Sequence, residues 1–322
     1  MTSKHLYSTT QTAARAFKHL PRRQLHGKFS HVTSRNMNSL QEASRIYRAF
    51  KKGGPTFGAW QMLPGSNHSR AIARSGVDWI CVDTEHGNID DGQMHEAVAA
   101  IGAMDVSPIV RIAANEAWMV KRALDAGAHG IIAPLIYSVD DAKRLVASAK
   151  FPPEGHRGFG SPFSPQTFTN EPITHYLLNA NKSLLTIVQI ETASALESVC
   201  SIAAIPGVDC LLIGPFDLGN NIGHPILGDG MHEELKEAIE RIKEAAHAEG
   251  KKVGIYCTSG EQAREYAEKG FDMVSISADM IAIPQAFAGA LAMASGKVTG
   301  REEKKGGGGY DGRYIEEGLS KG

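Results

Sequence analysis

The sequence predicts an α/β fold in which eight parallel strands close into a (β/α)8, or TIM, barrel. Short apolar runs alternate with helical patterns from residue 57 to residue 294. Because each parallel crossover needs a helix, this alternation indicates a parallel sheet. Eight strands with eight helices is the number that closes a TIM barrel. A doubly wound sheet is the alternative, but the first strand is followed by neither a G-x-G-x-x-G turn nor a GxxxxGK[ST] loop.

The expected elements follow in a regular order. Strands are assigned where runs rich in Val, Ile and Leu are bounded by turn residues, and helices where apolar residues recur at spacings of three and four. The expected strands are 57–63, 79–83, 108–112, 130–136, 185–191, 210–214, 252–256 and 273–277. The expected helices are 66–75, 90–103, 116–126, 139–149, 193–204, 231–249, 259–269 and 280–294. A further helix begins at the capping box Ser39-Leu-Gln-Glu42 and could plug the bottom of the barrel.

The two ends of the chain differ from the predicted barrel domain, which we place at residues 38–298. The first 41 residues contain seven Lys or Arg, four His and no acidic residue, with apolar and basic side chains on opposite helical faces. This composition is typical of a mitochondrial presequence. We therefore expect residues 1–37 to form a disordered extension that directs the protein to the mitochondrial matrix. If translation starts at Met37 instead, we expect a cytoplasmic protein. Residues 299–322, which are charged and glycine-rich, predict an unpacked tail.

Composition argues against several kinds of partner. The chain has 34 Lys+Arg and 35 Asp+Glu, so no basic stripe points to nucleic acid. No apolar run approaches the roughly 18 residues of a membrane-spanning helix. The four cysteines stand singly, which indicates reduced core thiols and no structural zinc site. One connection, residues 150–183, is too long for an ordinary barrel loop, and it predicts a lid or a subunit contact.

Acids and a histidine stand where three predicted strands end. Asp83, Glu85 and His86 follow the second strand, Glu191 ends the fifth, and Asp217 follows the sixth. TIM-barrel enzymes carry their reactive groups at the carboxyl ends of the strands. We therefore expect these side chains to meet in one polar site.

Glu191 and Asp217 form a candidate metal site, with Gln189 beside them. Two carboxylates, completed by water and substrate oxygens, suit Mg²⁺ or Mn²⁺, with Co²⁺ as a further option. Either acid alone could cap the following helix, but their occurrence as a pair favours the metal site. For Glu85 three roles remain as alternatives: a metal ligand, a residue that supports the ligands, or an ion-pair partner.

Asp83 and His86 are interpreted as an oriented base. A carboxylate that accepts a hydrogen bond from one imidazole nitrogen fixes the tautomer and raises the basicity of the other nitrogen. Arg111 lies at the end of the third strand, where its guanidinium could bind a carboxylate or a keto oxygen. The alternative for Arg111 is an internal ion pair with one of the acids.

The segment Gly214, Pro215 and Phe216 forms a tight turn before a helix, where backbone N–H groups could receive a small carboxylate. Together these parts fit a 2-oxo acid, with Arg111 at the ketone. Such a site acidifies the carbon beside the ketone and stabilises an enolate. A Schiff-base aldolase is disfavoured because no lysine stands at an equivalent strand end; Lys252 opens the seventh strand at the opposite rim.

These motifs together resemble the HpcH/HpaI aldolase family over residues 55–295. The segments that carry the resemblance include Asp83-Thr-Glu-His-Gly87, Val110-Arg-Ile112, Pro153-Glu-Gly-His-Arg-Gly158, Gln189-Ile-Glu-Thr192 and Ile213-Gly-Pro-Phe-Asp-Leu218. The resemblance implies a barrel of the phosphoenolpyruvate/pyruvate type and class II, metal-dependent aldol chemistry on pyruvate.

The family pattern also implies a role for each matching residue. Glu191 and Asp217 would bind the metal, Asp83 and His86 would form the base dyad, and Arg111 would hold the pyruvate oxygens. Asp125 would enter the site from a neighbouring subunit, because the family exchanges its last barrel helix and assembles as hexamers.

The leading functional hypothesis is a metal-dependent lyase that cleaves, or forms, 4-hydroxy-2-oxo acids through a pyruvate enolate. The alternative is decarboxylation of oxaloacetate at the same site, as in a fungal branch of the family similar to macrophomate synthase. A citrate-lyase reaction on a CoA thioester is disfavoured, since no basic pocket for the nucleotide is evident. A non-catalytic binder would predict a broken site, whereas every residue of the pattern is present.

Overall fold

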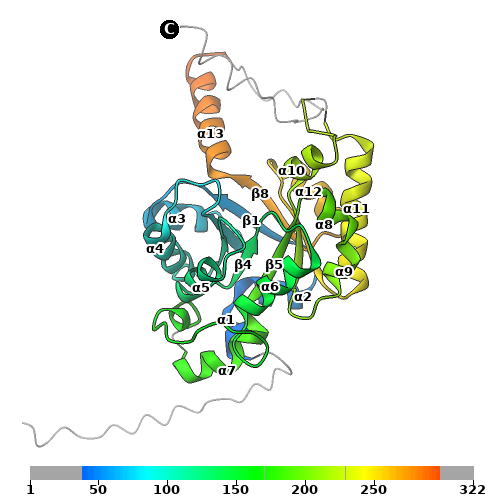
Figure 1. The fold of residues 1–322 in the computed structure, drawn as a ribbon. Coiled ribbons are helices and arrows are strands. Elements are labelled where there is room, and N and C mark those ends of the chain that lie inside the picture. Colours follow the sequence, from blue (N-terminus) through cyan, green and yellow to red (C-terminus); the bar gives the residue numbers. More distant parts are fainter. Residues whose placement is uncertain (1–37, 170, 229, 298–322) are drawn as a thin grey trace, which may run out of the picture. The chain divides into compact units, whose positions relative to one another are not determined.

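The computed structural model describes residues 38–169, 171–228 and 230–297, and these contain a closed barrel of eight parallel strands (Figure 1). The strands are β1 (Thr56–Gln61), β2 (Trp79–Asp83), β3 (Ser107–Arg111), β4 (Gly130–Ala133), β5 (Leu185–Ile190), β6 (Cys210–Ile213), β7 (Lys252–Ile255) and β8 (Met273–Ala278). Each strand pairs with the next in chain order, and β8 returns to pair with β1. The predicted TIM-barrel fold is confirmed.

Helices follow the strands close to their predicted bounds. They are α3 (Ser66–Ala73), α4 (Asp91–Gly102), α5 (Ala117–Asp125), α6 (Val139–Ala149), α8 (Ala193–Glu197), α9 (Val199–Ala203), α11 (Glu233–Ala248), α12 (Gly260–Glu268) and α13 (Asp279–Ala294). The helix expected at 193–204 is divided into α8 and α9 at Ser198. A short helix, α10 (Pro215–Asn221), lies between β6 and α11.

The helix predicted before the barrel is two helices, α1 (Ser39–Ala43) and α2 (Arg45–Lys52), separated by the extended residue Ser44. The capping box is also shifted by one residue from the predicted Ser39. Asn38 Oδ1 accepts from the N–H of Gln41 at 3.0 Å, and the Gln41 side chain accepts from the N–H of Asn38. Ile46 of α2 is fully buried among the side chains inside the barrel, so the predicted plug is present.

A compact set of large side chains fills the barrel interior. Trp60, Trp79, Ile109, Ile187 and Leu212 are among its members, and each is at most 2% exposed. The close packing depends on Gly58 of β1, because a Cβ at this position would lie 2.1 Å from the indole ring of Trp79. A larger apolar core lies between the strands and the surrounding helices.

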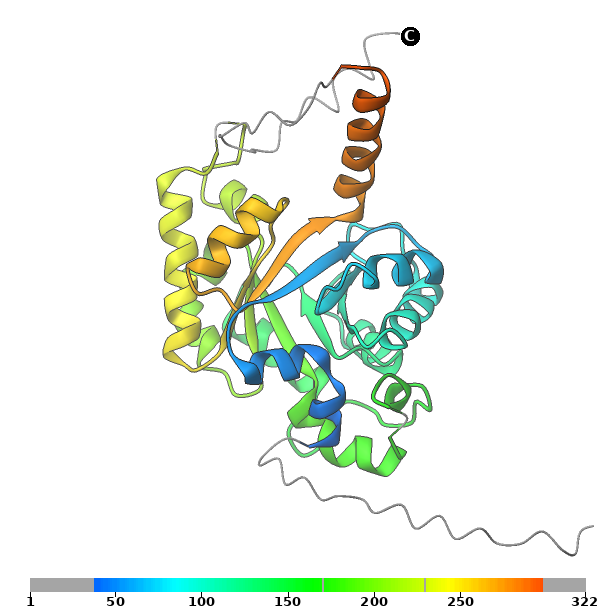
Figure 2. The ribbon, with the colours of Figure 1, turned by 180° about the vertical axis from the view of Figure 1, so that it is seen from behind.

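The long connection after α6 contains a 3₁₀ turn, η1 (Ser164–Thr167), and α7 (Ile173–Ser183). Figures 1 and 2 show α7 beside α1, where Gln41 Nε2 and Tyr47 Oη both donate to the carbonyl of Lys182. This is the amino end of the barrel strands. The prediction of a lid is therefore wrong within this chain, because the polar strand ends lie at the opposite rim. A subunit contact stays a prediction.

The last barrel helix, α13, projects from the rim in both views (Figures 1 and 2). Its only buried residue is Asp279, whose carboxylate accepts from the N–H groups of Met62 and Leu63 and pairs with His68. Phe287 and Leu291 are about 70% exposed, at 74% and 69%. None of the described helices is long and apolar enough to cross a membrane. The predicted presequence at 1–37 and the predicted tail at 299–322 lie outside the described residues.

His129, at the entrance to β4, is a buried base in the neutral form. Its Nδ1 lies 3.0 Å from Ser107 Oγ and its Nε2 lies 3.2 Å from the carbonyl oxygen of Thr167. Because a carbonyl only accepts, Nε2 carries the proton. The ring also stacks on Phe168, with 4.1 Å between the centroids. Burial lowers the pKa of His129 from 6.5 to about 4.

We therefore expect the free energy of unfolding to fall as the pH decreases from 6.5 to about 4. In this interval the unfolded chain binds a proton at His129 that the folded chain does not bind. The shift corresponds to at most about 3 kcal/mol. Urea unfolding of the wild type and of His129→Gln at pH 7, 5.5 and 4.5 measures how much of the pH-dependent loss of stability comes from His129. The variant should lose stability less steeply, and equal pH dependence in the two proteins would contradict the assignment.

Candidate active site

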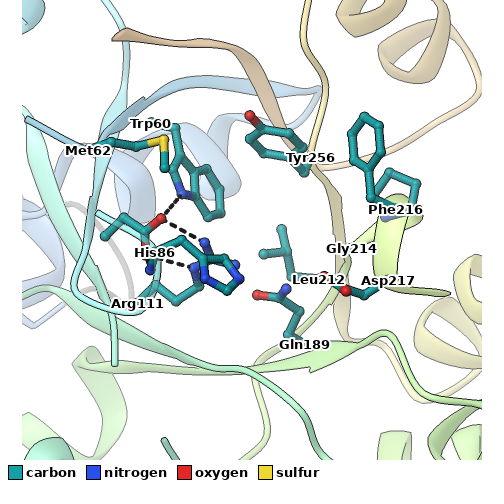
Figure 3. Close-up of a pocket in the computed structure, with 12 residues that line it drawn as sticks. Trp60, Met62, His86, Arg111, Gln189, Leu212, Gly214, Phe216, Asp217 and Tyr256 are labelled. Carbon is teal, nitrogen blue, oxygen red and sulfur yellow. Dashed lines mark hydrogen bonds and ion pairs between the residues drawn. The ribbon is translucent and has the colours of Figure 1, made fainter. Parts of the chain in front are cut away.

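A cavity of about 200 Å³ lies at the carboxyl ends of the strands (Figure 3). Its lining comes from β1, β2, β3, β5, β6 and β7 and from the segments that follow them. The lining residues are Trp60, Met62, Asp83, His86, Arg111, Gln189, Leu212, Gly214, Pro215, Phe216, Asp217 and Tyr256. This set contains all the residues predicted from the sequence for the site except Glu85, Glu191 and Asp125.

Asp83 and Arg111 form a buried ion pair at one wall of the cavity. They end β2 and β3, and the strand register places them side by side. Arg111 Nε donates to Asp83 Oδ1 at 3.0 Å, and Nη2 donates to Oδ2 at 2.7 Å. Burial would raise the pKa of the Asp83 carboxyl, but Arg111 holds it below its ordinary value. Trp60 Nε1 also donates to Asp83, and its ring lies under the guanidinium.

The structure corrects the predicted dyad of Asp83 and His86. Asp83 Oδ1 accepts from the backbone N–H of His86 at 3.3 Å, and no hydrogen bond joins the carboxylate to the imidazole. The His86 side chain is 61% exposed, and its Nε2 lies 3.8 Å from Glu85 Oε1. The imidazole points into the open cavity (Figure 3). Asp83 therefore positions the loop that carries His86, while Arg111 neutralises the negative charge of the Asp83 carboxylate.

Glu85 pairs with Arg111 and also feels the negative charge of Asp217. Its Oε2 lies 2.9 Å from Arg111 Nη1, an ion pair that lacks the alignment of a hydrogen bond. Burial and the negative charges of Asp83 and Asp217 raise the pKa of Glu85 to about 6, although Arg111 opposes them. Of the alternatives for Glu85, the ion pair with Arg111 is present.

Glu191 is fixed behind the cavity wall. Its Oε1 accepts from the N–H of Leu135 at 2.7 Å, and its Oε2 accepts from Gln189 Nε2. A Cβ at Gly214 would lie 2.5 Å from Oε2, so only glycine leaves room for the carboxylate. Burial raises the pKa of Glu191, and the charges of Asp217 and Glu85 raise it further.

The acids of this site repel one another, and the side-chain amide beside them is incompletely paired. Glu85 and Glu191 each feel the charge of Asp217. Gln189 Oε1 is buried and accepts no hydrogen bond. A cation in the cavity would relieve this repulsion and provide a positive partner for these oxygens. The residues therefore fit a divalent metal of the oxygen-binding kind.

The turn after β6 differs in part from the predicted carboxylate receptor. Pro215 is the first residue of α10, so the turn lacks one backbone N–H at this position. Asp217 lies in the first turn of α10 and faces the cavity, as Figure 3 shows. The turn thus places an acid next to Gly214 and offers fewer donors than expected.

An aromatic wall borders the cavity and was largely missed in the sequence. Tyr256 packs edge-on against Trp60, with 5.1 Å between the ring centroids, and against Phe216 at 6.3 Å. Figure 3 shows these rings together with Met62 on one side of the cavity. Tyr256 directly follows β7, so the rule that selected the acids at strand ends could have selected it.

Other aromatic residues of the chain, and Asp125, lie away from this cavity. Tyr176 is buried beside Phe168, and Phe159 and Phe163 belong to the exposed connection after α6. Asp125 ends α5, where its carboxylate binds Arg157 Nη2 at 2.8 Å. Because Asp125 does not line the cavity of its own chain, its predicted role requires a neighbouring subunit.

The fold and the site together define a TIM-barrel protein with a polar, acid-rich cavity at the carboxyl ends of its strands. The sequence model for "HpcH/HpaI aldolase/citrate lyase" matches residues 58–286, and the chain belongs to this family. It is 37% identical over 237 residues to a hydroxypyruvate/pyruvate aldolase of Paraburkholderia phytofirmans, a match that covers 72% of this chain and 90% of the relative.

Solved structures agree with this assignment. An HpcH/HpaI aldolase/citrate lyase family protein from Burkholderia cenocepacia superposes with a TM-score of 0.70 at 36% identity, over 80% of this chain and 100% of that chain. Macrophomate synthase superposes with a TM-score of 0.68 at 24% identity, over 80% of this chain and 88% of that chain, which shows the shared fold. Aldolase-named relatives support a lyase.

Proposed function

We propose that this protein is a divalent-metal-dependent lyase that cleaves a 4-hydroxy-2-oxo acid to pyruvate and an aldehyde. The observation that carries the proposal is the charge of Asp217 that Glu85 and Glu191 each feel, together with the buried Gln189 Oε1 that accepts no hydrogen bond. With Asp83, four carboxylates lie around this cavity, and Arg111 pairs with two of them, Asp83 and Glu85. Such an excess of negative charge is costly unless a cation shares the site.

Glu191 and Asp217 would hold the metal. Among the described residues, these acids and Glu85 do not all place oxygens within 4.8 Å of one another, so we assign two protein ligands and leave the rest to water and substrate. When bound, the cation would withdraw electron density from the keto oxygen and so favour the enolate. Mg²⁺ and Mn²⁺ are the ions we expect, because the donors are oxygens.

His86 would move the proton. In the cleavage direction it accepts the proton of the 4-hydroxyl group, and the electron pair of that O–H bond forms the carbonyl of the aldehyde. The bond between C3 and C4 then breaks, and its electrons form the enolate of pyruvate. A proton delivered to C3 completes pyruvate. His86 suits this role because its imidazole is exposed in the cavity and forms no hydrogen bond with another described side chain.

Arg111 would place a fixed positive charge beside the reacting oxygens. Its guanidinium is held by Asp83 and Glu85, so it needs little reorganisation when substrate binds. The aromatic wall of Trp60, Tyr256 and Phe216 would contact the aldehyde part of the substrate.

The test is turnover of the full chain with 4-hydroxy-2-oxo acids, measured as pyruvate and aldehyde release, with EDTA and after addition of Mg²⁺ or Mn²⁺. We expect activity that EDTA removes and the metal restores. Oxaloacetate is assayed in parallel for carbon dioxide. Decarboxylation without aldehyde release from any 4-hydroxy-2-oxo acid would support the alternative reaction, and turnover unaffected by EDTA would contradict metal dependence.

Gly214→Ala should weaken metal binding while the barrel stays folded. The added Cβ would meet Glu191 Oε2 at 2.5 Å and Gln189 Nε2 at 2.9 Å, and both are ends of side chains that can move away. We expect Mn²⁺ affinity, measured by calorimetry, to fall by about tenfold, the order found when groups supporting a metal ligand are lost. Gly260→Ala, where a Cβ meets nothing within 4 Å, is the matched control. Unchanged Mn²⁺ affinity in Gly214→Ala would contradict the placement of the metal.

We also propose that the enzyme works as a homo-oligomer, in which Asp125 completes the site of a neighbouring subunit. The exposed apolar face of α13 supports association, as does the exposed Trp118 on α5. Mixing inactive His86→Ala with inactive Asp125→Asn tests this, because mixed oligomers would contain some intact sites. Recovery of activity on mixing is expected, and its absence in verified mixed oligomers would argue against a shared site.

A further inference from the structure

A cluster of metal-binding side chains lies outside the catalytic cavity, at the connection between α10 and α11. Its members are His224, His232 and Glu234. In the described part of the chain, this is the group of three His, Cys, Asp or Glu side chains whose ligand atoms all lie within 4.8 Å of one another. His224 is partly buried, and the other two are exposed. The cluster has no role in the lyase reaction proposed above.

Backbone hydrogen bonds or helix positions fix the backbone of each of the three residues. The N–H of His224 donates to the carbonyl of Gly219 in α10 at 2.8 Å. His232 is the N-cap of α11, and its Nδ1 accepts from the N–H of Glu234 at 3.4 Å. Glu234 lies in the first turn of α11. The α10 and α11 helices also pack against each other (Figure 1).

The side chains already contact one another as a unit. The imidazole rings of His224 and His232 stack in parallel, with 4.0 Å between their centroids and 3° between their planes. His224 Nε2 pairs with Glu234 Oε2. A tetrahedral zinc ion with bonds of about 2.1 Å needs ligand atoms roughly 3.4 Å apart. Rotation of the exposed His232 and Glu234 side chains would bring the three ligand atoms to this spacing.

The donor chemistry separates this cluster from the catalytic cavity. Two imidazole nitrogens and one carboxylate select Zn²⁺ and neighbouring transition ions, whereas the cavity offers oxygen donors that suit Mg²⁺ or Mn²⁺. We propose that His224, His232 and Glu234 form a second metal site that binds Zn²⁺, with water as the fourth ligand.

The zinc site would restrain the connection that follows α10, the helix that carries Asp217. Asp217 lies in α10, and His224 follows three residues after the end of this helix. A zinc ion would link the end of α10 to the start of α11. The two ends of the connection between these helices would then be held together. We therefore expect Zn²⁺ to reduce hydrogen exchange in the peptides that cover residues 222–232.

The experiment is a Zn²⁺ titration of the full chain carrying Glu191→Ala and Asp217→Ala, which removes the oxygen-ligand site. We expect one Zn²⁺ per chain, with affinity lowered at least tenfold when His224→Ala or His232→Ala is added. Glu237→Ala, one turn further along α11 and also exposed, should leave the affinity unchanged. Co²⁺ in place of Zn²⁺ should give the strong visible absorption of a four-coordinate ion.

Two results would overturn the proposal. One is the absence of Zn²⁺ binding at micromolar concentrations in the chain that retains all three side chains. The other is binding that His224→Ala and His232→Ala leave unchanged. Because these measurements use binding alone and a chain without the catalytic acids, their failure would leave the proposed lyase activity unaffected. Failure of the lyase assay would likewise leave the zinc site untouched.

Discussion

Replacing Glu191 with glutamine is expected to remove measurable lyase turnover while the protein stays folded. The glutamine keeps the size of the side chain and can still accept the hydrogen bond from the N–H of Leu135. It loses the negative charge that we assign to the metal. We expect kcat/KM to fall by at least about 10³-fold, which corresponds to about 4 kcal/mol of transition-state stabilisation.

The same substitution should weaken Mn²⁺ binding, and calorimetry measures that effect independently of turnover. Glu197→Gln is the matched control, because Glu197 lies in α8, directly after the same strand, and is exposed. This control should retain both activity and metal affinity. If Glu191→Gln bound Mn²⁺ as tightly as the wild type, the assignment of Glu191 as a ligand would fail. If it bound Mn²⁺ weakly and kept full activity, the metal would have no part in catalysis.

The sequence predicted the barrel and the position of the site because both depend on a simple periodicity. Each strand is a short apolar run, and the carboxyl ends of parallel strands meet at one rim. Asp83, Arg111, Gln189 and Asp217 stand at or after such ends, and all four line the cavity. The predicted strand bounds differ from the observed ones mostly at the ends, where the apolar pattern continues into the next loop.

The contacts within the site could not be predicted in the same way. Asp83 binds Arg111 because the register of β2 and β3 places them as neighbours, and register does not follow from the pattern of one strand. His86 lies in the loop beyond β2, where no periodicity fixes the direction of a side chain. The sequence therefore identified residues that line one cavity, but it paired the Asp83 carboxylate with His86 where the structure pairs it with Arg111.

The long connection after α6 and the aromatic wall show a second limit. The length of the connection predicted a lid or a subunit contact, but length does not tell which rim of the barrel it covers. Tyr256 and Leu212 are apolar or amphipathic residues near strand ends, so they look like core residues in the sequence. Only the closed barrel shows that they face the cavity.

Replacing Arg111 with methionine is expected to destabilise the protein more than any other single change considered for this cavity. The guanidinium is almost fully buried and binds Asp83 with two hydrogen bonds, and it also pairs with Glu85. Removing one partner of a buried ion pair costs about 3–5 kcal/mol because the remaining charge is uncompensated. Urea unfolding at pH 8 measures this cost.

The loss should be smaller at pH 5 than at pH 8. In the wild type, Arg111 holds the pKa of Asp83 below its ordinary value, and this pairing stabilises the fold above that ordinary pKa. Without Arg111, burial raises the pKa values of Asp83 and Glu85 above those of the unfolded chain. Each carboxyl then binds a proton more readily when folded, so the penalty shrinks as the pH falls. A penalty independent of pH would show that the lost energy is packing and not charge.

Two further variants separate charge from geometry. Arg111→Lys keeps the positive charge and loses the planar fork, so we expect part of the stability to return without the activity. Arg122→Met removes an arginine from an exposed pair with Asp91 and should cost no more than about 1 kcal/mol. If Arg111→Lys kept full turnover, the guanidinium would serve only as a counter-charge for Asp83 and Glu85. The proposed action of Arg111 on the substrate oxygens would then have to be abandoned.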